Sequence, residues 1–234
     1  MIEVQTEELP TPQLLGAAIG QKVLADVPFI AGLDRFLGTG LNPETRDYLH
    51  EMGASCATAG AVALFHVENI TPEAIDDGRD LLEPDHRTYT LDDRQLQAHF
   101  ASYPVMWEDK DANPEKCFIG CPHLSLEQLY WWTEKIEARL REMGRKQLPV
   151  KTTICAAPQI LQAFKSDAEA CEKLERAGVK LSRGCPMQLF DNELSAGEAI
   201  VTNSDKLRAY TPARFFPDSE LVEILVSGEG KRVS

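Results

Sequence analysis

Residues 116–158, KCFIGCPHLSLEQLYWWTEKIEARLREMGRKQLPVKTTICAAP, carry the pattern that decides the fold. Lys116 to Gly120 predicts a strand, Ser125 to Met143 a long helix, and Val150 to Ile154 a second strand. Ser125 and Gln128 match a capping box, in which the two side chains satisfy free backbone N–H groups where a helix begins. A strand, a helix and a strand at this spacing predict parallel neighbouring strands with the helix packed on the sheet.

The same alternation continues to the end of the chain. We expect a helix at Pro158–Ala177 that ends at Gly178, strands at Val179–Leu181 and Ala199–Thr202, and short helices after Asn203 and around Leu221–Val226.

Elements upstream are predicted from caps, prolines and apolar runs. The first twelve residues are interpreted as a polar lead-in, followed by a helix at Leu14–Leu24 and a short extended run at residues 27–30. Asn42 and Pro43 begin a helix that is expected to end at Gly53. Small residues at 54–60 then lead into an apolar run at Ala61–Val67, which predicts a strand buried on both faces. Helix starts are also expected at Thr71-Pro72 and at residues 90–93.

These elements predict an α/β protein with mostly parallel sheets and flanking helices. We expect two regions. Residues 1–115 contain the small-residue segment and the buried strand, and residues 116–234 contain the cysteine turns; one continuous domain is the alternative. A length of 234 residues accommodates either arrangement.

Charge and composition exclude some classes of partner. Asp and Glu number 37 against 24 Lys and Arg, giving a formal charge of −13, and the basic residues are scattered along the sequence. Nucleic acid and anionic membranes are therefore not expected as main partners, because phosphate binding needs clustered positive charge. The chain shows no apolar stretch long enough to span a bilayer and no signal pattern, so we expect a cytosolic protein whose six cysteines are mostly reduced.

Three cysteines follow predicted strands. Cys121 comes after Gly120, Cys155 comes after Ile154, and Cys185 lies in a Gly184-Cys185-Pro186 turn. In a parallel sheet, functional groups gather at the carboxyl ends of strands, so these thiols would lie along one edge if the strands are neighbours. Thiolates are soft ligands that suit iron–sulfur clusters or zinc. The alternative for each cysteine is a small hydrophobic core residue.

A second group of polar residues follows the strand at Ala199–Thr202. Thr202, Asn203, Ser204 and Lys206 lie where a strand turns into a helix, and backbone N–H groups with these side chains would bind a carboxylate or phosphate. The alternative is an ordinary helix cap beside a solvated lysine. His123, two residues after Cys121, is a further candidate for the site, or else helps to cap the following helix. His66 is interpreted as a hydrogen-bonded core residue.

Four motifs in this order resemble the aconitase X family. They are GCPHLSLE at 120–127, the preceding VALFHV at 62–67 with ITPEA at 70–74, the second cysteine turn at 177–186, and VTNSDK at 201–206. The resemblance extends from about residue 13 to the end, and corresponds to the C-terminal portion of the family's large catalytic subunit.

The resemblance implies a metal-dependent dehydratase related to aconitase. Family activities include dehydration of mevalonate 5-phosphate and of hydroxyproline. Carried over, Cys121 and Cys185 would be ligands of an iron–sulfur cluster, Ser204 and Lys206 would be catalytic, and Thr202, Asn203 and His123 would bind substrate. The partners would be a small swivelling subunit or domain and an N-terminal part of the catalytic subunit that this chain lacks.

Two other readings of the same residues stay open. In the first, the thiols bind zinc, and the protein is a hydrolase or contains a structural metal site. In the second, the chain is a non-catalytic partner-binding domain with its cysteines in the core. Iron with sulfide in the purified protein would favour the dehydratase, and zinc would favour the hydrolase or structural site. Thiols that are buried and far apart would favour the partner-binding domain.

Overall fold

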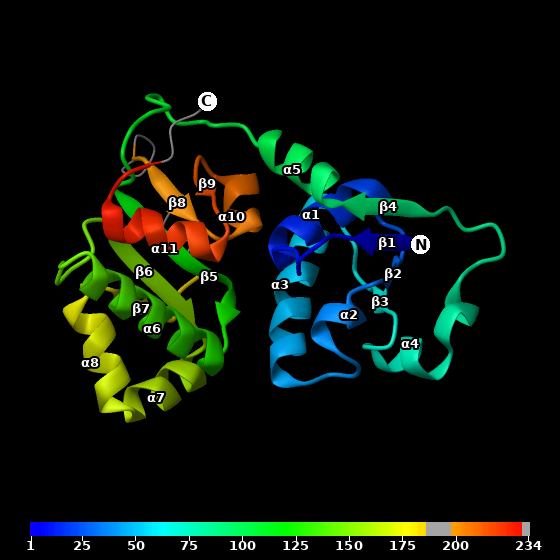
Figure 1. Ribbon diagram of the computed structural model, residues 1–234, viewed down its shortest axis with the longest axis horizontal. Coiled ribbons are helices and arrows are strands. Elements are labelled where there is room, and N and C mark those ends of the chain that lie inside the picture. Colours follow the sequence, from blue (N-terminus) through cyan, green and yellow to red (C-terminus); the bar gives the residue numbers. More distant parts are fainter. Residues whose placement is uncertain (186–197, 231–234) are drawn as a thin grey trace. The chain divides into compact units, whose positions relative to one another are not determined.

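The structure is a computed structural model that describes residues 1–185 and 198–230. It divides the chain into two compact units, Met1–Pro104 and Val105–Ser234. Each unit contains one parallel sheet with helices packed on it, which confirms the predicted α/β class (Figure 1). No helix among the described residues has the length and apolar character that crossing a bilayer requires.

The first unit contains a four-stranded sheet in the order β3-β2-β1-β4. Its elements are β1 Ile2–Gln5, α1 Pro12–Val23, β2 Phe29–Ala31, α2 Asp34–Leu37, α3 Pro43–Gly60, β3 His66–Val67, α4 Pro72–Asp76, a 3-10 helix Gly78–Leu81, β4 Tyr89–Asp92 and α5 Asp93–Ala101. The interpretation of the first residues as a lead-in is wrong. Ile2 and Val4 are buried, and β1 is a central strand that pairs with both β2 and β4.

The small-residue segment at 54–60 continues helix α3, so the predicted helix end at Gly53 is also wrong. Its small side chains serve close packing of α3 against α1. A Cβ at Gly60 would lie 2.1 Å from the carbonyl oxygen of Gly20, and one at Gly16 would lie 2.1 Å from that of Met52. The sequence showed a break because glycine disfavours helices, but here tertiary packing outweighs that preference.

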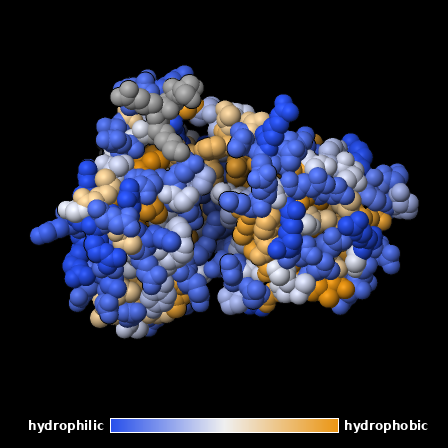
Figure 2. Space-filling view, viewed as in Figure 1, coloured by the Kyte–Doolittle hydropathy of each residue, from blue (hydrophilic) through white to orange (hydrophobic). Residues whose placement is uncertain are grey.

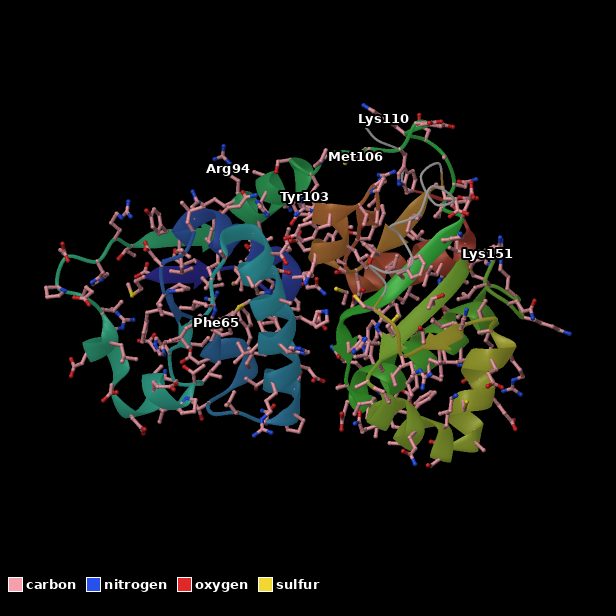
Figure 3. All side chains as sticks on the ribbon, turned by 180° about the vertical axis from the view of Figure 1, so that it is seen from behind. Phe65, Arg94, Tyr103, Met106, Lys110 and Lys151 are labelled. Carbon is pink, nitrogen blue, oxygen red and sulfur yellow. The ribbon has the colours of Figure 1, made fainter. Side chains whose placement is uncertain are left out.

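The apolar run after α3 is mostly a connection. Ala61 ends the helix with φ +57°, and only His66 and Val67 are in strand β3. Leu64 is exposed, so the expectation of a strand buried on both faces is wrong. The ring of Phe65, labelled in Figure 3, lies against Gly53, where a Cβ would be 3.0 Å from it. His66 is mostly buried, and its Nδ1 has no hydrogen-bond partner among the described residues.

The second unit contains a five-stranded sheet in the order β7-β6-β5-β8-β9. Its described elements are β5 Lys116–Leu124, α6 Leu126–Glu142, β6 Lys151–Ala156, α7 Pro158–Ser166, α8 Ala168–Arg176, β7 Lys180–Ser182, β8 Ile200–Thr202, α10 Asp205–Tyr210, β9 Arg214–Phe215 and α11 Asp218–Ser227. The capping box of Ser125 and Gln128 is confirmed at the start of α6. The helix expected at 158–177 is two helices, because Asp167 caps a new one through the N–H of Ala170.

Residues of β5 alternate between the two faces of this sheet. Cys117 and Ile119 belong to the main core, which packs under α6, α7, α8 and α11 and contains Trp132 and Phe164. Phe118 belongs to a smaller core on the other face, with Leu207 of α10. The long helix α6 therefore covers one face, and the carboxyl ends of the strands remain available for a site.

The order of strands in this sheet reverses between β5 and β8. From β5 the chain moves through β6 to β7 on one side and later returns to add β8 and β9 on the other. Ligands in open parallel sheets bind at such a reversal, outside the carboxyl ends of the two central strands. The loops after β5 and β8 are therefore the place where this unit is built to hold a ligand.

Candidate functional site

The predicted cysteines and the polar turn lie at the carboxyl ends of adjacent strands. Strands β7, β6, β5 and β8 are neighbours in the sheet. Cys121 and Cys155 lie within the last four residues of β5 and β6, and Cys185 and Ser204 lie within three residues after β7 and β8. The condition set for the thiols to lie along one edge, that these strands are neighbours, is therefore met. Pro186, the last residue of the second cysteine turn, lies outside the described residues.

The backbones of β5 and β6 approach closely beside Cys121. Gly120 has φ +100°, and a Cβ there would lie 2.2 Å from the carbonyl oxygen of Cys155. The register of the two strands shifts between Ile119 and Leu124, and the Cys121–Pro122 peptide bond is cis. A residue with a side chain at position 120 would push the strands apart, so glycine here fixes how Cys121 is presented.

The thiol of Cys121 interacts with groups from two other strand ends. Burial raises its pKa, a hydrogen bond from the Ser204 hydroxyl lowers it, the charge of Cys185 raises it, and the charge of Lys206 lowers it. Charge effects of this kind need proximity, because charge interactions weaken with distance. Cys185 and Lys206, which follow Cys121 by 64 and 85 positions in the sequence, therefore both act on its sulfur atom.

Cys155 is a third thiol in the same place. Burial raises its pKa to about 11, a hydrogen bond from Ser182 lowers it, and the charges of Cys185 and Cys121 raise it. The Ser182 hydroxyl also accepts a hydrogen bond of 3.1 Å from the N–H of Gly184, which shapes the turn that carries Cys185. Cys155 is fully buried, whereas Cys121 is half-buried and Cys185 is exposed.

The turn after β8 is held by its own polar side chains. The Thr202 hydroxyl donates to the carbonyl of Phe118 at 2.6 Å and accepts from the N–H of Ser204 at 3.0 Å. The Ser204 hydroxyl caps α10 by accepting from the N–H of Leu207 at 3.1 Å. Ser204 is therefore a helix cap, and at the same time a partner of the Cys121 thiol.

Asn203 links this turn to helix α11. Its Nδ2 donates to Oδ1 of Asp218 at 2.9 Å, while its buried Oδ1 has no hydrogen-bond partner among the described residues. Burial raises the pKa of Asp218 to about 6, and the hydrogen bond from Asn203 lowers it. The same carboxylate raises the pKa of the buried Cys117 thiol, after the larger effect of burial. Asn203 therefore anchors the turn to the core side of the sheet.

The other predicted site residues lie at the same edge. Lys206 is exposed on the first turn of α10, and His123 is half-buried near the end of β5. Ser125 provides the cap of α6, so the alternative role of His123 as a cap is not needed. The substrate-binding roles of Thr202, Asn203 and His123 and the catalytic roles of Ser204 and Lys206 stay predictions.

The donor set fits part of a metal site. The charge of Cys185 acts on the Cys121 thiol, and Gly120, which has no side chain, lets the carbonyl of Cys155 approach closely beside Cys121. However, no group of three or more His, Cys, Asp or Glu side chains in the described part of the chain is arranged to hold a metal ion. The thiols at these strand ends therefore suit a metal site in their chemistry, and the ligand roles of Cys121 and Cys185 stay predictions.

Two residues of this region were not found from the sequence. Ser182 ends strand β7, and the rule that placed Cys121 at a strand end would also have pointed to it. Asp218 begins α11 and meets Asn203 only through the fold, so no local signal marks it.

Comparison with known proteins matches both units to one family. The family model of the aconitase X second domain matches residues 1–101, and that of the aconitase X third domain matches residues 115–224. The crystal structure of the holo-form of Thermococcus kodakaraensis aconitase X superposes with a TM-score of 0.68 at 26% identity, covering 95% of this chain and 54% of that one.

Curated relatives also match this chain over most of its length. The phosphomevalonate dehydratase large subunit of Thermococcus kodakarensis is 33% identical over 202 residues, which cover 84% of this chain and 45% of the relative. The cis-3-hydroxy-L-proline dehydratase of Hypocrea jecorina is 26% identical over 207 residues, covering 85% and 32%. The chain thus spans at most about half the length of these relatives. Two domain models of one family, matched in order along both units, show that the chain belongs to the aconitase X family.

Proposed function

We propose that this chain forms part of a hydro-lyase that removes water from a small hydroxy acid. The observation that carries the proposal is the interaction of the Cys121 thiol with Cys185, Ser204 and Lys206 at the carboxyl ends of the strands of the second sheet. The relatives support it, because they are named as dehydratases of phosphomevalonate and of cis-3-hydroxy-L-proline. Both substrates carry a hydroxyl group and an acidic group, and we propose a substrate of this class.

We further propose that Cys121 and Cys185 hold an iron–sulfur cluster. A bound cluster would supply an iron that polarises the substrate hydroxyl as a Lewis acid. The hydrogen bond from Ser204 and the charge of Lys206 both favour the thiolate form of Cys121, which is the form that binds metal. This environment offsets only part of the effect of burial, which favours the neutral thiol, and the pKa of Cys121 stays above its ordinary value.

The exposed ammonium group of Lys206 would hold the acidic group of the substrate and so fix its orientation. Ser204 is the candidate proton-transfer residue by its position, since its hydroxyl lies beside the Cys121 sulfur. The buried side chains of Thr202 and Asn203 keep the turn in place through Phe118 and Asp218. We propose that these contacts hold the reacting groups in position before substrate arrives.

The proposed partner is a small subunit or swivelling domain that completes the active site. The relatives from Thermococcus kodakarensis and Methanosarcina mazei are named as large subunits, and this chain spans 45% and 37% of them. We propose that the complete enzyme acts in the cytosol, where cysteine ligands stay reduced.

The test is a cysteine substitution in the complete, anaerobically purified enzyme. Cys121→Ser is expected to remove bound iron and sulfide and to lower turnover of mevalonate 5-phosphate or of cis-3-hydroxyproline by at least about a hundredfold. Cys171→Ser is the matched control, because Cys171 lies half-buried on α8. It should change neither quantity.

Three outcomes contradict the proposal. Iron and turnover that survive Cys121→Ser would exclude this residue as a ligand. Zinc without iron or sulfide in the purified enzyme would favour the hydrolase reading. An enzyme with a bound cluster that dehydrates no hydroxy acid would keep the metal site and reject the reaction.

A further inference from the structure

A cavity beside the second sheet, at the end where its strands begin, is lined mainly by basic side chains. Its volume is about 750 Å³, and it lies between the last turns of α6 and α8 and the loop after α6. Its cations are Arg141, Arg145, Lys146, Lys173 and Arg176. The two helices pack together, and Figure 1 shows them on one side of the sheet. A cavity of this size is in the range that holds small-molecule ligands.

The cavity is separate from the candidate active site. Helix α6 begins next to the carboxyl end of β5 and runs back to the loop that precedes β6. Helix α8 likewise ends just before β7 begins. The cavity therefore lies at the end of the sheet where the parallel strands begin, and Figure 3 labels Lys151 there, at the start of β6. Cys121 and Ser204 lie at the opposite end, where the strands finish.

The positive charge in the cavity is mostly uncompensated. Lys173 is paired with Glu137 at 3.5 Å and with Glu169 at 2.9 Å, and Glu137 is the one carboxylate among the described lining residues. The other four cations have no carboxylate within ion-pair distance among residues 1–185 and 198–230. This grouping occurs in a chain whose formal charge is −13.

Helix dipoles explain only part of this grouping. Cations near a helix C-terminus are stabilised by the partial negative charge there, which accounts for Arg141, Lys173 and Arg176. Arg145 and Lys146 lie beyond the end of α6 and gain nothing from it, because the dipole effect falls off within the last turn. Like charges that converge on one cavity repel each other unless an anion lies between them.

The lining selects the kind of anion. Three of the cations are arginines, whose planar guanidinium groups form paired hydrogen bonds with phosphate oxygens. Leu140 and Ala177 are buried and provide an apolar floor. Hydrophilic residues predominate on the surface over α8 in Figure 2. Several cations around an apolar floor suit a ligand with more than one phosphate group.

We propose that this cavity binds a small molecule that carries a diphosphate group, at a site distinct from the one where dehydration is proposed. The diphosphate would lie between Arg141, Arg145, Lys146 and Arg176, and any carbon part of the ligand would lie on Leu140 and Ala177. The shared chemistry is the diphosphate group, which either free pyrophosphate or a nucleoside diphosphate supplies.

The experiment is isothermal titration calorimetry, which measures the affinity of the full chain for pyrophosphate, ADP and AMP. Pyrophosphate or ADP should bind with a single site, and AMP should bind at least about tenfold more weakly because it lacks the second phosphate. ADP binding about tenfold more tightly than pyrophosphate identifies a nucleotide, and equal affinities identify the free diphosphate group.

A charge-matched pair of variants separates a site from general attraction. Arg145→Ser with Arg176→Ser removes two cations that line the cavity, and should weaken binding at least about tenfold. Lys151→Ser with Lys180→Ser removes two exposed cations at the starts of β6 and β7, outside the lining, and should weaken it less than about twofold. Circular dichroism verifies that each variant is folded.

Four results would overturn the proposal. They are no binding of either diphosphate at millimolar concentration, equal binding of AMP, equal weakening in both variant pairs, and binding of an oligoglutamate peptide in preference to pyrophosphate. None of these results bears on the dehydratase proposal, because the variants leave the carboxyl edge of the sheet unchanged.

Discussion

Replacing Gly120 by alanine tests the close approach of β5 and β6 beside Cys121. Gly120 has φ +100°, and a Cβ there would lie 2.2 Å from the backbone carbonyl oxygen of Cys155. The backbone conformation alone costs an alanine about 1–3 kcal/mol. Because the atom it meets belongs to the backbone, relief requires the strands to separate, which adds about 1–3 kcal/mol. We therefore expect the free energy of unfolding to fall by about 2–6 kcal/mol.

Gly178→Ala is the matched control for this change. Gly178 has φ +84°, and a Cβ there would meet nothing within 4 Å, so only the conformational cost of about 1–2 kcal/mol applies. Urea unfolding of both variants, followed by circular dichroism, measures the difference. If Gly120→Ala unfolds at the same urea concentration as Gly178→Ala, the close contact of the two strands is not present and the reasoning is refuted.

Two further predictions concern a buried acid and a helix contact. Burial raises the pKa of Asp218 to about 6 from its ordinary value of 3.8, so the folded state holds this proton more tightly and the contribution of Asp218 to stability falls as pH rises from about 4 to about 6. Asp218→Asn keeps an acceptor for Asn203, and its free energy of unfolding should rise by about 1–3 kcal/mol relative to the wild type between pH 4 and pH 7. Urea unfolding at several pH values measures this change, and the same pH dependence in both proteins would contradict the prediction. Gly60→Ala should lose about 1–3 kcal/mol in thermal unfolding, because its Cβ would lie 2.1 Å from the carbonyl oxygen of Gly20. Gly53→Ala, in the same helix, faces only the ring of Phe65 and should change stability by less than about 1 kcal/mol; equal losses would contradict the packing of α1 on α3.

The sequence predicted most of the second unit because its signals are local. The capping box at Ser125, the proline at 158 and Gly178 mark helix ends through contacts within a few residues, and the structure contains helix boundaries at all three. The order of the strands could also be anticipated, since strand–helix–strand units place successive strands side by side. The neighbouring positions of β5, β6 and β7 follow from this rule.

The first unit was harder to predict because its helices depend on tertiary contacts. The glycines of α1 and α3 weaken each helix locally, and only the packing of one helix on the other restores them. The polar appearance of the first residues hid β1, whose buried side chains are only Ile2 and Val4. A four-residue strand with two inward-facing residues gives too short a pattern to distinguish from a loop.

Contacts between residues far apart in the sequence could not be predicted either, because they too depend on the tertiary fold. Asn203 meets Asp218, and Ser182 meets Cys155, only after the sheet has formed. The scattered cations around α6 and α8 likewise gather only in the fold, so the absence of a basic run in the sequence did not reveal the cavity that they line.

Cross-linking of the reduced chain tests directly whether Cys121 and Cys185 share one pocket. A short reagent with two thiol-reactive ends, added under anaerobic conditions, is expected to join these two cysteines, and mass spectrometry of the digested protein identifies the linked peptides. The linked species should disappear in Cys185→Ser and persist in Cys171→Ser. Single modification of both Cys121 and Cys185, without any peptide that joins them, would contradict the shared pocket.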